Sequence, residues 1–210
     1  MNQEMKFKTE QEIFWAGEFG DEYNQRNRGS ALLASNLNFF TKALQASRNL
    51  TSCIEFGANI GMNLRAIQLL YPEIDLYAIE INQAATHELA QIVPEHQIHQ
   101  GTILDFHADR TWDLVLIKGV LIHINPAELP GVYDKLAIST RRYVLVAEYY
   151  NPSPVGINYR GHSDRLFKRD FAGELMDRHP ELKLLDYGFA YRRDPNFPQD
   201  DITWFLMEKG

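Results

Sequence analysis

Apolar and polar residues follow two different periods along this chain, and the two periods alternate. Short apolar runs typical of buried strands are separated by longer segments in which apolar residues recur at helical spacing. The expected strands cover residues 51–56, 75–80, 96–99, 112–117 and 142–148, followed by a late pair at 182–190 and 202–209. The expected helices cover residues 9–26, 30–46, 61–70, 83–92, 126–139 and 168–178.

Alternating strands and helices followed by a strand pair predict a doubly wound α/β fold. We expect a mostly parallel seven-stranded sheet with helices on both faces and an antiparallel C-terminal hairpin. Residues 1–210 then form a single domain, in which residues 1–48 make an N-terminal helical cap or lid and residues 49–210 the core. In such sheets ligands bind at the carboxyl ends of the strands, where the strand order reverses.

The first strand runs directly into a turn that contains two glycines, Gly57 and Gly61. Glycine lets the chain bend sharply and lets a ligand approach the backbone closely. Glu80 stands nineteen residues after Gly61, at the end of the second expected strand. An acid at that position suits the two hydroxyl groups of a ribose. The pair of features predicts a site for a nucleoside cofactor.

The acid Glu55, two residues before Gly57, narrows the choice of cofactor. A carboxylate beside a pyrophosphate is repulsive, whereas the ammonium of an amino-acid moiety is attracted to it. S-adenosylmethionine carries both a ribose and such an ammonium. The segment 101–105 has apolar side chains for the face of an adenine, and Asp105 either accepts from the adenine amino group or caps a loop or helix.

Residues 50–150 resemble the class I S-adenosylmethionine-dependent methyltransferases. The 55–61 turn is similar to their first motif, Glu80 to their second, the segment 101–105 to their adenine-contacting motif and the segment 119–124 to the turn after their fourth strand. The resemblance implies a Rossmann-like methyltransferase fold. Asn59 replaces the usual middle glycine, but asparagine tolerates a left-handed backbone better than most residues. The implied cofactor contacts within this region are Glu55, Gly57, Ala58, Asn59, Gly61, Glu80, Ile81, Thr102, Ile103, Leu104, Lys118 and Gly119.

The flanking segments resemble a narrower family, the methylases associated with pseudaminic acid biosynthesis. The similar segments are FWAGEFGDEYNQRN near the start, YRGHSDRLFKRDFAGELM after residue 158 and FPQDDITWFLMEK near the end. This resemblance implies O-methylation of a small polar, sugar-derived acceptor such as a nonulosonate or its nucleotide-linked form.

Aromatic residues are concentrated in the expected cap. They either pack a helix against the core or close over the methionine end, where aromatic faces favour the sulfonium cation. Trp15 and Tyr23 are the expected cofactor contacts. Arg26 pairs either with the cofactor carboxylate or with a surface acid.

A hydroxyl acceptor needs a base as it attacks the methyl group. The candidates for the base are His123, His162 and Glu148. The expected loop 148–168 leaves the fifth strand at the ligand-binding edge and is the expected acceptor pocket. Its candidate substrate contacts are Tyr149, Tyr159, Arg160 and Arg165, and an arginine there suits an acidic sugar.

Composition limits the remaining alternatives. The net charge of −7 argues against general binding to nucleic acid or to an anionic membrane. The single cysteine, Cys53, lies in the first expected strand, and no His/Cys group has the spacing of a metal site. The polar N-terminus and the absence of a long apolar run predict a cytoplasmic protein with a small-molecule acceptor, of undetermined oligomeric state. A nicotinamide-dependent oxidoreductase and a non-catalytic cofactor-binding protein stay open as alternatives.

Overall fold

The predicted seven-stranded sheet is present in the computed structural model, which describes residues 7–210 apart from the side chains of 162–164. The strand order is β3-β2-β1-β4-β5-β9-β8; the first five of these are parallel, and β9 and β8 are antiparallel to their neighbours. The strands of this sheet are β1 (Ser52–Phe56), β2 (Asp75–Glu80), β3 (Ile98–Gln100), β4 (Trp112–Lys118), β5 (Thr140–Glu148), β8 (Leu182–Ala190) and β9 (Ile202–Lys209).

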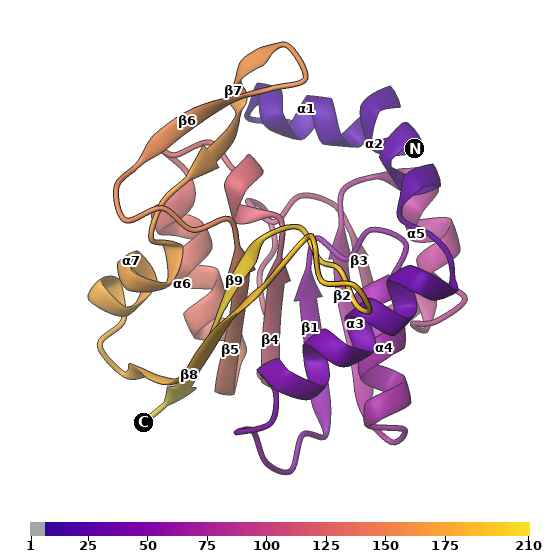
Figure 1. Ribbon diagram of the computed structural model, residues 1–210, viewed down its shortest axis with the longest axis vertical. Coiled ribbons are helices and arrows are strands. Elements are labelled where there is room, and N and C mark those ends of the chain that lie inside the picture. Colours follow the sequence, from indigo (N-terminus) through magenta and orange to yellow (C-terminus); the bar gives the residue numbers. More distant parts are fainter. Residues whose placement is uncertain (1–6) are drawn as a thin grey trace.

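The helices lie on both faces of this sheet and over its carboxyl edge (Figure 1). They are α1 (Glu10–Ala16), α2 (Glu18–Arg26), α3 (Ser30–Ala43), α4 (Met62–Leu70), α5 (Gln83–Leu89), α6 (Leu129–Ser139) and α7 (Phe171–Arg178), with short 3-10 helices η1 (Glu95–Gln97) and η2 (Leu121–His123). The sheet order reverses between β1 and β4, so the chain leaves these two adjacent strands toward opposite faces of the sheet, and the crevice between the two connections has room for a ligand.

Two hydrophobic clusters, one on each face, hold the layers together. Alternate residues of the central strands enter one cluster or the other, because successive side chains of a strand point to opposite faces. In β4, Leu114 and Leu116 pack with α3, α4 and α5, whereas Val115 and Ile117 pack with α6 and α7. These four residues are fully buried, which explains why β4 reads as a continuous apolar run.

The N-terminal cap differs from the single helix expected over 9–26. It consists of two helices, α1 and α2, that meet at Gly17. Thr9 begins α1 with a capping box, since its hydroxyl accepts from the backbone N–H of Glu12 and the Glu12 carboxylate accepts from the backbone N–H of Thr9. Figure 1 shows α1 and α2 lying across the carboxyl edge of the sheet.

The prediction of a loop over 148–168 was wrong in part, because this segment contains a β-hairpin. Strands β6 (Val155–Tyr159) and β7 (His162–Lys168) form a separate two-stranded sheet whose end lies beside α1 (Figure 1). Arg160 and Gly161 both have positive φ, 51° and 88°, which is the backbone of the two-residue turns that suit a hairpin. Because the first of these residues is arginine, the sequence lacks the Asn-Gly or Asp-Gly pair that usually predicts such a turn.

The remaining differences are at element ends. Helix α5 ends at Leu89 instead of residue 92, α6 begins at Leu129 instead of 126, and α7 begins at Phe171 after its cap Asp170. No described helix is both long and apolar enough to cross a membrane.

We predict that Asp113→Ala destabilises the fold. Asp113 is buried at the start of β4; its carboxylate accepts from the backbone N–H and hydroxyl of Thr51 at 2.9 and 2.6 Å and from the guanidinium of Arg141. Removing it deletes the acceptor of the hydrogen bonds from Thr51 and Arg141, at a cost of about 1.5–3 kcal/mol, the usual range for hydrogen bonds to a charged group. Urea unfolding measures the change, with the exposed Asp109→Ala as the control. Equal midpoints for the two variants would contradict the role assigned to Asp113.

Candidate active site

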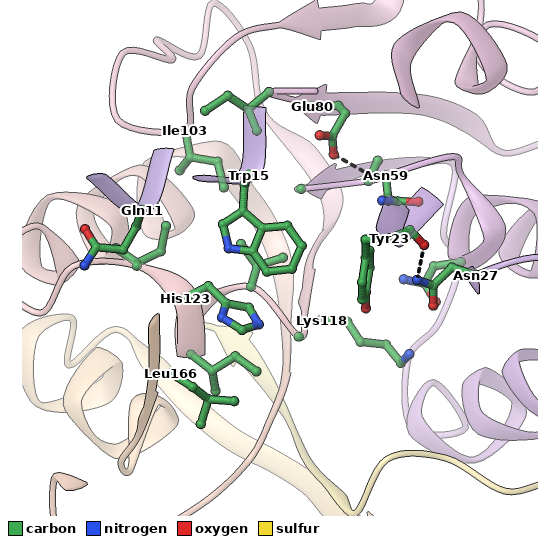
Figure 2. A pocket seen from close by; sticks show the side chains of 18 of the residues that line it. Gln11, Trp15, Tyr23, Asn27, Asn59, Glu80, Ile103, Lys118, His123 and Leu166 are labelled. Carbon is green, nitrogen blue, oxygen red and sulfur yellow. Dashed lines mark hydrogen bonds between the residues drawn. The ribbon is translucent and has the colours of Figure 1, made fainter. Parts of the chain in front are cut away.

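A cavity of about 450 Å³ lies between the cap and the carboxyl ends of β1, β2 and β4. Sites for small molecules and cofactors have volumes of roughly 300–1,000 Å³. The cavity walls come from the 57–63 turn, the ends of β2 and β4, the cap, the β6–β7 hairpin and residues 199–202. Figure 2 shows Trp15, Tyr23, His123 and Glu80 grouped around it.

The turn after β1 contains three left-handed residues, two of which line the cavity. Gly57, Asn59 and Gly61 have φ of 78°, 50° and 81°. A side chain at Gly57 would lie 2.7 Å from a methyl of Val120, and one at Gly61 would lie 2.7 Å from a methyl of Leu89, so both positions require glycine for space as well as conformation. Gly57, Ala58 and Asn59 line the cavity, whereas Gly61 lies behind it at the start of α4.

Glu80 lines the cavity at the end of β2, as its position in the sequence leads one to expect. One carboxylate oxygen accepts from the backbone N–H of Asn59 and the other from that of Asn82, each at 2.7 Å. Burial raises the pKa of this carboxyl, and the hydrogen bonds from the backbone oppose that shift. Each oxygen keeps a second lone pair for a ligand hydroxyl.

The Glu55 carboxyl is fully buried beneath the cavity and does not line it. One oxygen accepts from the side-chain amide of Asn63 at 2.6 Å, and Asn63 itself lines the cavity. Burial raises the pKa of Glu55 to about 8, although Asn63 and Lys118 lower it. Glu55 therefore orients the Asn63 side chain, which lines the cavity, and does not line the cavity itself.

The expected adenine-contacting residues gather at one end of the cavity. Ile81, Thr102, Ile103 and Leu104 all line it. Glu12, from the cap, also lines this end and accepts a short hydrogen bond from the Thr102 hydroxyl. The Asp105 carboxylate instead pairs with Lys8 at 2.6 Å on the surface, so the acid at this end of the cavity is Glu12.

The last residue of β4, Lys118, and the chain after it, with Gly119 and His123, line the cavity. Burial lowers the pKa of Lys118, whose ammonium lies 5.5 Å from the centre of the Phe39 ring. Glu148 lies behind this segment: its carboxylate accepts from the backbone N–H groups of Val120 and Leu121, and burial raises its pKa to about 7. Glu148 does not line the cavity, and its contacts shape the turn that does.

The geometry of His123 fixes its tautomer. Nδ1 lies 2.6 Å from the carbonyl oxygen of Arg165; since a carbonyl only accepts, Nδ1 carries the proton and Nε2 keeps a free lone pair. Burial lowers the pKa of His123 to about 4, so the ring is neutral at pH 7. Figure 2 shows the imidazole below the Trp15 indole, with 4.6 Å between the ring centres.

Trp15 and Tyr23 of the cap line the cavity, and their ring centres are 5.2 Å apart in an edge-to-face arrangement. Burial raises the pKa of Tyr23 to about 12, so its hydroxyl stays protonated. Arg26 does not line the cavity; its guanidinium lies over the rings of Phe19 and Tyr23.

The expected acceptor contacts divide into two groups. Tyr149, Tyr159 and Arg160 line the cavity. Arg165 instead pairs with Glu10 of α1 at 3.1 Å and lies over the Phe14 ring, so it joins the hairpin to the cap. The side chain of His162 lies outside the described residues.

Several polar residues of the cavity escaped the sequence-based selection: Gln11, Glu12, Asn27, Asn36, Asn63, Asn125, Gln199 and Asp200. Half of them come from helices, where a polar residue on one face is indistinguishable from a solvated one. Gln199 and Asp200 lie in the segment FPQDDITWFLMEK, one of those that carry the family resemblance, and Gln199 donates to the buried Asn36 side chain at 2.9 Å. Among the described residues, no three His, Cys, Asp or Glu side chains are grouped closely enough to hold a metal ion.

The sheet order and the position of the cavity define the Rossmann-like fold of S-adenosylmethionine-dependent methyltransferases. Magnesium protoporphyrin IX methyltransferase ChlM from Synechocystis PCC 6803, solved with bound SAH, is similar with a TM-score of 0.67. It is 14% identical, over 95% of this chain and 98% of that chain.

Two further solved structures show the same likeness. N-methyltransferase NodS from Bradyrhizobium japonicum WM9, in complex with S-adenosyl-L-homocysteine (SAH), has a TM-score of 0.63 at 13% identity over 95% of this chain and 96% of that chain. DesVI from Streptomyces venezuelae has a TM-score of 0.63 at 13% identity over 92% of this chain and 99% of that chain. No protein-family profile and no curated protein matches the sequence. At these identities the likeness establishes the fold, and the ligands belong to those proteins.

We predict that Glu55→Gln flattens the pH dependence of stability. The folded-state pKa of about 8 lies above the ordinary value of 4.5, so the contribution of the neutral acid is complete below pH 4.5 and is lost as the pH rises through 8. Glutamine still accepts from Asn63 and carries no charge. Between pH 5 and pH 9, the free energy of unfolding of the variant should therefore rise relative to that of the wild type by on the order of 3 kcal/mol. Melting curves over this range measure it, and parallel curves would refute the buried neutral acid.

Proposed function

We propose that this protein is an S-adenosylmethionine-dependent methyltransferase that transfers a methyl group to a hydroxyl of a small polar acceptor. The observation that carries the proposal is the arrangement of Glu80, the left-handed 57–61 turn and the aromatic cap around one cavity. The SAH-bound structures with the same fold support the choice of cofactor.

The residues of the cavity fit the parts of this cofactor in order. The ribose hydroxyls would bind the free lone pairs of Glu80, and the adenine would lie among Ile81, Ile103 and Leu104 near the Glu12–Thr102 pair. The methionine end would follow the turn toward Asn63 and Lys118. Because the Asn63 amide nitrogen donates to Glu55, its amide oxygen is left as an acceptor for the cofactor ammonium.

The cap supplies what the sulfonium needs. A sulfonium is a cation without a proton to donate, so it is favoured by the faces of aromatic rings rather than by hydrogen-bond acceptors. Trp15 and Tyr23 offer such rings within the cavity. When bound, the cofactor supplies an activated methyl group, and the protein has to align the acceptor and exclude water.

His123 is the base that the geometry favours. The bound cofactor would supply the methyl group, and the acceptor hydroxyl that takes this group would release its proton. The hydroxyl proton passes to Nε2 of His123, which is unprotonated at neutral pH. The Nδ1 contact with the carbonyl of Arg165 holds the ring in this tautomer.

The acceptor would occupy the end of the cavity between the hairpin and residues 199–202. Tyr149 and Tyr159 supply rings and hydroxyls, Arg160 a cation and Asp200 a carboxylate. Aromatic faces with polar groups between them suit a sugar, and Arg160 suits a carboxylate on it. Together with the resemblance of the flanking segments, this supports a nonulosonate of the pseudaminic acid type, free or nucleotide-linked. The proposal takes residues 1–210 as one catalytic domain that works in the cytoplasm on a small molecule.

A nicotinamide-dependent oxidoreductase would also use Glu80 to bind a ribose, but its cofactor would require room for a pyrophosphate at the 57–61 turn. Calorimetric titration with SAH and with NAD separates the two, and binding of NAD in place of SAH would refute the methyltransferase. Mass spectrometry of free and nucleotide-linked nonulosonates, incubated with enzyme and methyl-labelled cofactor, tests the acceptor. Transfer to a hydroxyl is expected, and transfer to an amine would revise the reaction.

We predict that Glu80→Gln weakens SAH binding about tenfold to a hundredfold. The amide keeps one acceptor oxygen but loses the second, together with the charge that strengthens hydrogen bonds to ribose hydroxyls. The exposed Glu73→Gln is the matched control, because it makes the same chemical change on the surface. Equal dissociation constants for SAH in both variants would mean that the ribose lies elsewhere.

We also predict that His123→Phe lowers kcat by about 10²–10⁴-fold with little change in the KM for the cofactor, since an aromatic ring is kept but the base is lost. The exposed His87→Phe should retain full turnover. Because the pKa of His123 is about 4, the wild-type rate should not fall between pH 8 and pH 6, as it would with an ordinary histidine base. Normal turnover by His123→Phe would remove His123 from the mechanism.

A further inference from the structure

The acid at the end of β2 belongs to a closed ring of hydrogen bonds that includes the cap. Glu80 accepts from the backbone N–H groups of Asn59 and Asn82. The Asn59 side chain donates to Asn24 Oδ1 at 2.7 Å, and Asn24 Nδ2 donates to Asn82 Oδ1 at 3.0 Å. The ring therefore runs from Glu80 through Asn59, Asn24 and Asn82 back to Glu80, and Asn24, from α2, is its member from the cap.

Three of the four members of this ring are buried, where a lost hydrogen bond costs most. Asn24 and Asn82 are each 2% exposed and Glu80 is 6% exposed. A buried amide that loses its partner keeps the full cost of its desolvation. Asn24 can therefore leave its place only if Asn59 and Asn82 both lose a bond.

The partners of Asn24 are the two residues that orient the Glu80 carboxylate. Asn59 is also held by its own turn, since its side-chain oxygen accepts from the backbone N–H of Ile60 at 2.7 Å. Asn82 begins α5, because its side-chain oxygen also accepts from the backbone N–H of Ala85 at 2.9 Å. A movement of Asn24 is thus transmitted to Asn59 and Asn82, whose backbone N–H groups hold the Glu80 carboxylate.

Two further contacts seat the cap on Asn82. Its side-chain nitrogen donates to the Asp21 carboxylate at 2.8 Å. At Gly20 a Cβ atom would lie 2.0 Å from the carbonyl oxygen of Trp15 and 2.8 Å from the Asn82 amide nitrogen. The bend between α1 and α2 can therefore rest against Asn82 only with glycine at this position. Trp15 of α1 and Tyr23 of α2 lie on either side of this bend. Closing the hydrogen-bond ring therefore also brings their aromatic side chains over the cavity.

We infer that Asn24 is a positioning residue that couples closure of the cap to binding of the nucleoside, through the two asparagines that hold Glu80. The inference rests on the proposed function, because it takes the ribose of S-adenosylmethionine or SAH as the ligand of Glu80. With the ring closed, the carboxylate is oriented for the ribose and the aromatic rings of the cap lie over the methionine end. With the ring open, both are lost together. Because coupling is reciprocal, bound SAH must stabilise the closed cap by the factor that closure adds to affinity.

The test combines calorimetry of SAH binding with hydrogen exchange of the 18–26 backbone, on wild type and three variants. In the wild type, SAH should slow exchange in 18–26. Asn24→Ala should bind SAH roughly ten- to a hundredfold more weakly and show no such protection at saturating SAH. Gln25→Ala is the matched control, because it removes an amide from an exposed position one residue along the same helix, and it should match the wild type in both measurements.

The Asn24→Asp variant distinguishes the loss of a hydrogen bond from a change in side-chain volume. It keeps the volume of asparagine and the bond from Asn59, but it places an acceptor opposite the Asn82 oxygen. It should therefore resemble Asn24→Ala, and it also carries the test if Asn24→Ala fails to fold. Wild-type affinity and protection in Asn24→Asp would overturn the inference while leaving the proposed function intact. Failure of the wild type to bind SAH would overturn the proposed function, and the inference with it.

Discussion

The buried carboxylate of Glu80 is the interaction on which the carboxyl edge of the sheet depends. A charge or a polar carboxyl that loses water must be paired, and Glu80 is paired with backbone N–H groups from two separate loops. One of these loops is the left-handed turn after β1, and the other begins α5. The acid thereby fixes two walls of the cavity, which it also lines itself. The strand order puts it there, because β1 and β2 are adjacent and parallel.

The walls of the cavity come from segments that are far apart in the sequence. The cap comes from the N-terminal segment, the hairpin follows β5, and Gln199 and Asp200 precede β9. Arg165 joins the hairpin to α1, and Gln199 joins the last loop to Asn36 of α3. These contacts are polar and lie around the cavity, whereas the apolar clusters lie deeper, on the two faces of the sheet.

The sequence predicts the part of the molecule that is governed by local rules. Strand and helix alternation, the turn glycines and the acid at Glu80 each reflect a constraint that acts within a few residues, and the sheet follows from them. The hairpin was missed because Arg160 occupies a left-handed position usually filled by glycine or asparagine. Asn24 was missed for a different reason: an asparagine in a polar helix shows nothing of its partners 35 and 58 residues away. Glu55 was expected to face the cofactor, but its complete burial depends on how α4 and β4 pack around it.

The central claim is that this cavity holds an adenosine by its ribose at Glu80, under the closed cap. A crystal structure of the protein with SAH tests it most directly. The account predicts both ribose hydroxyls within about 3 Å of the Glu80 carboxylate oxygens, the adenine against Ile103, and Asn24 still bonded to Asn59 and Asn82. SAH bound elsewhere, or a ribose without contact to Glu80, would contradict it.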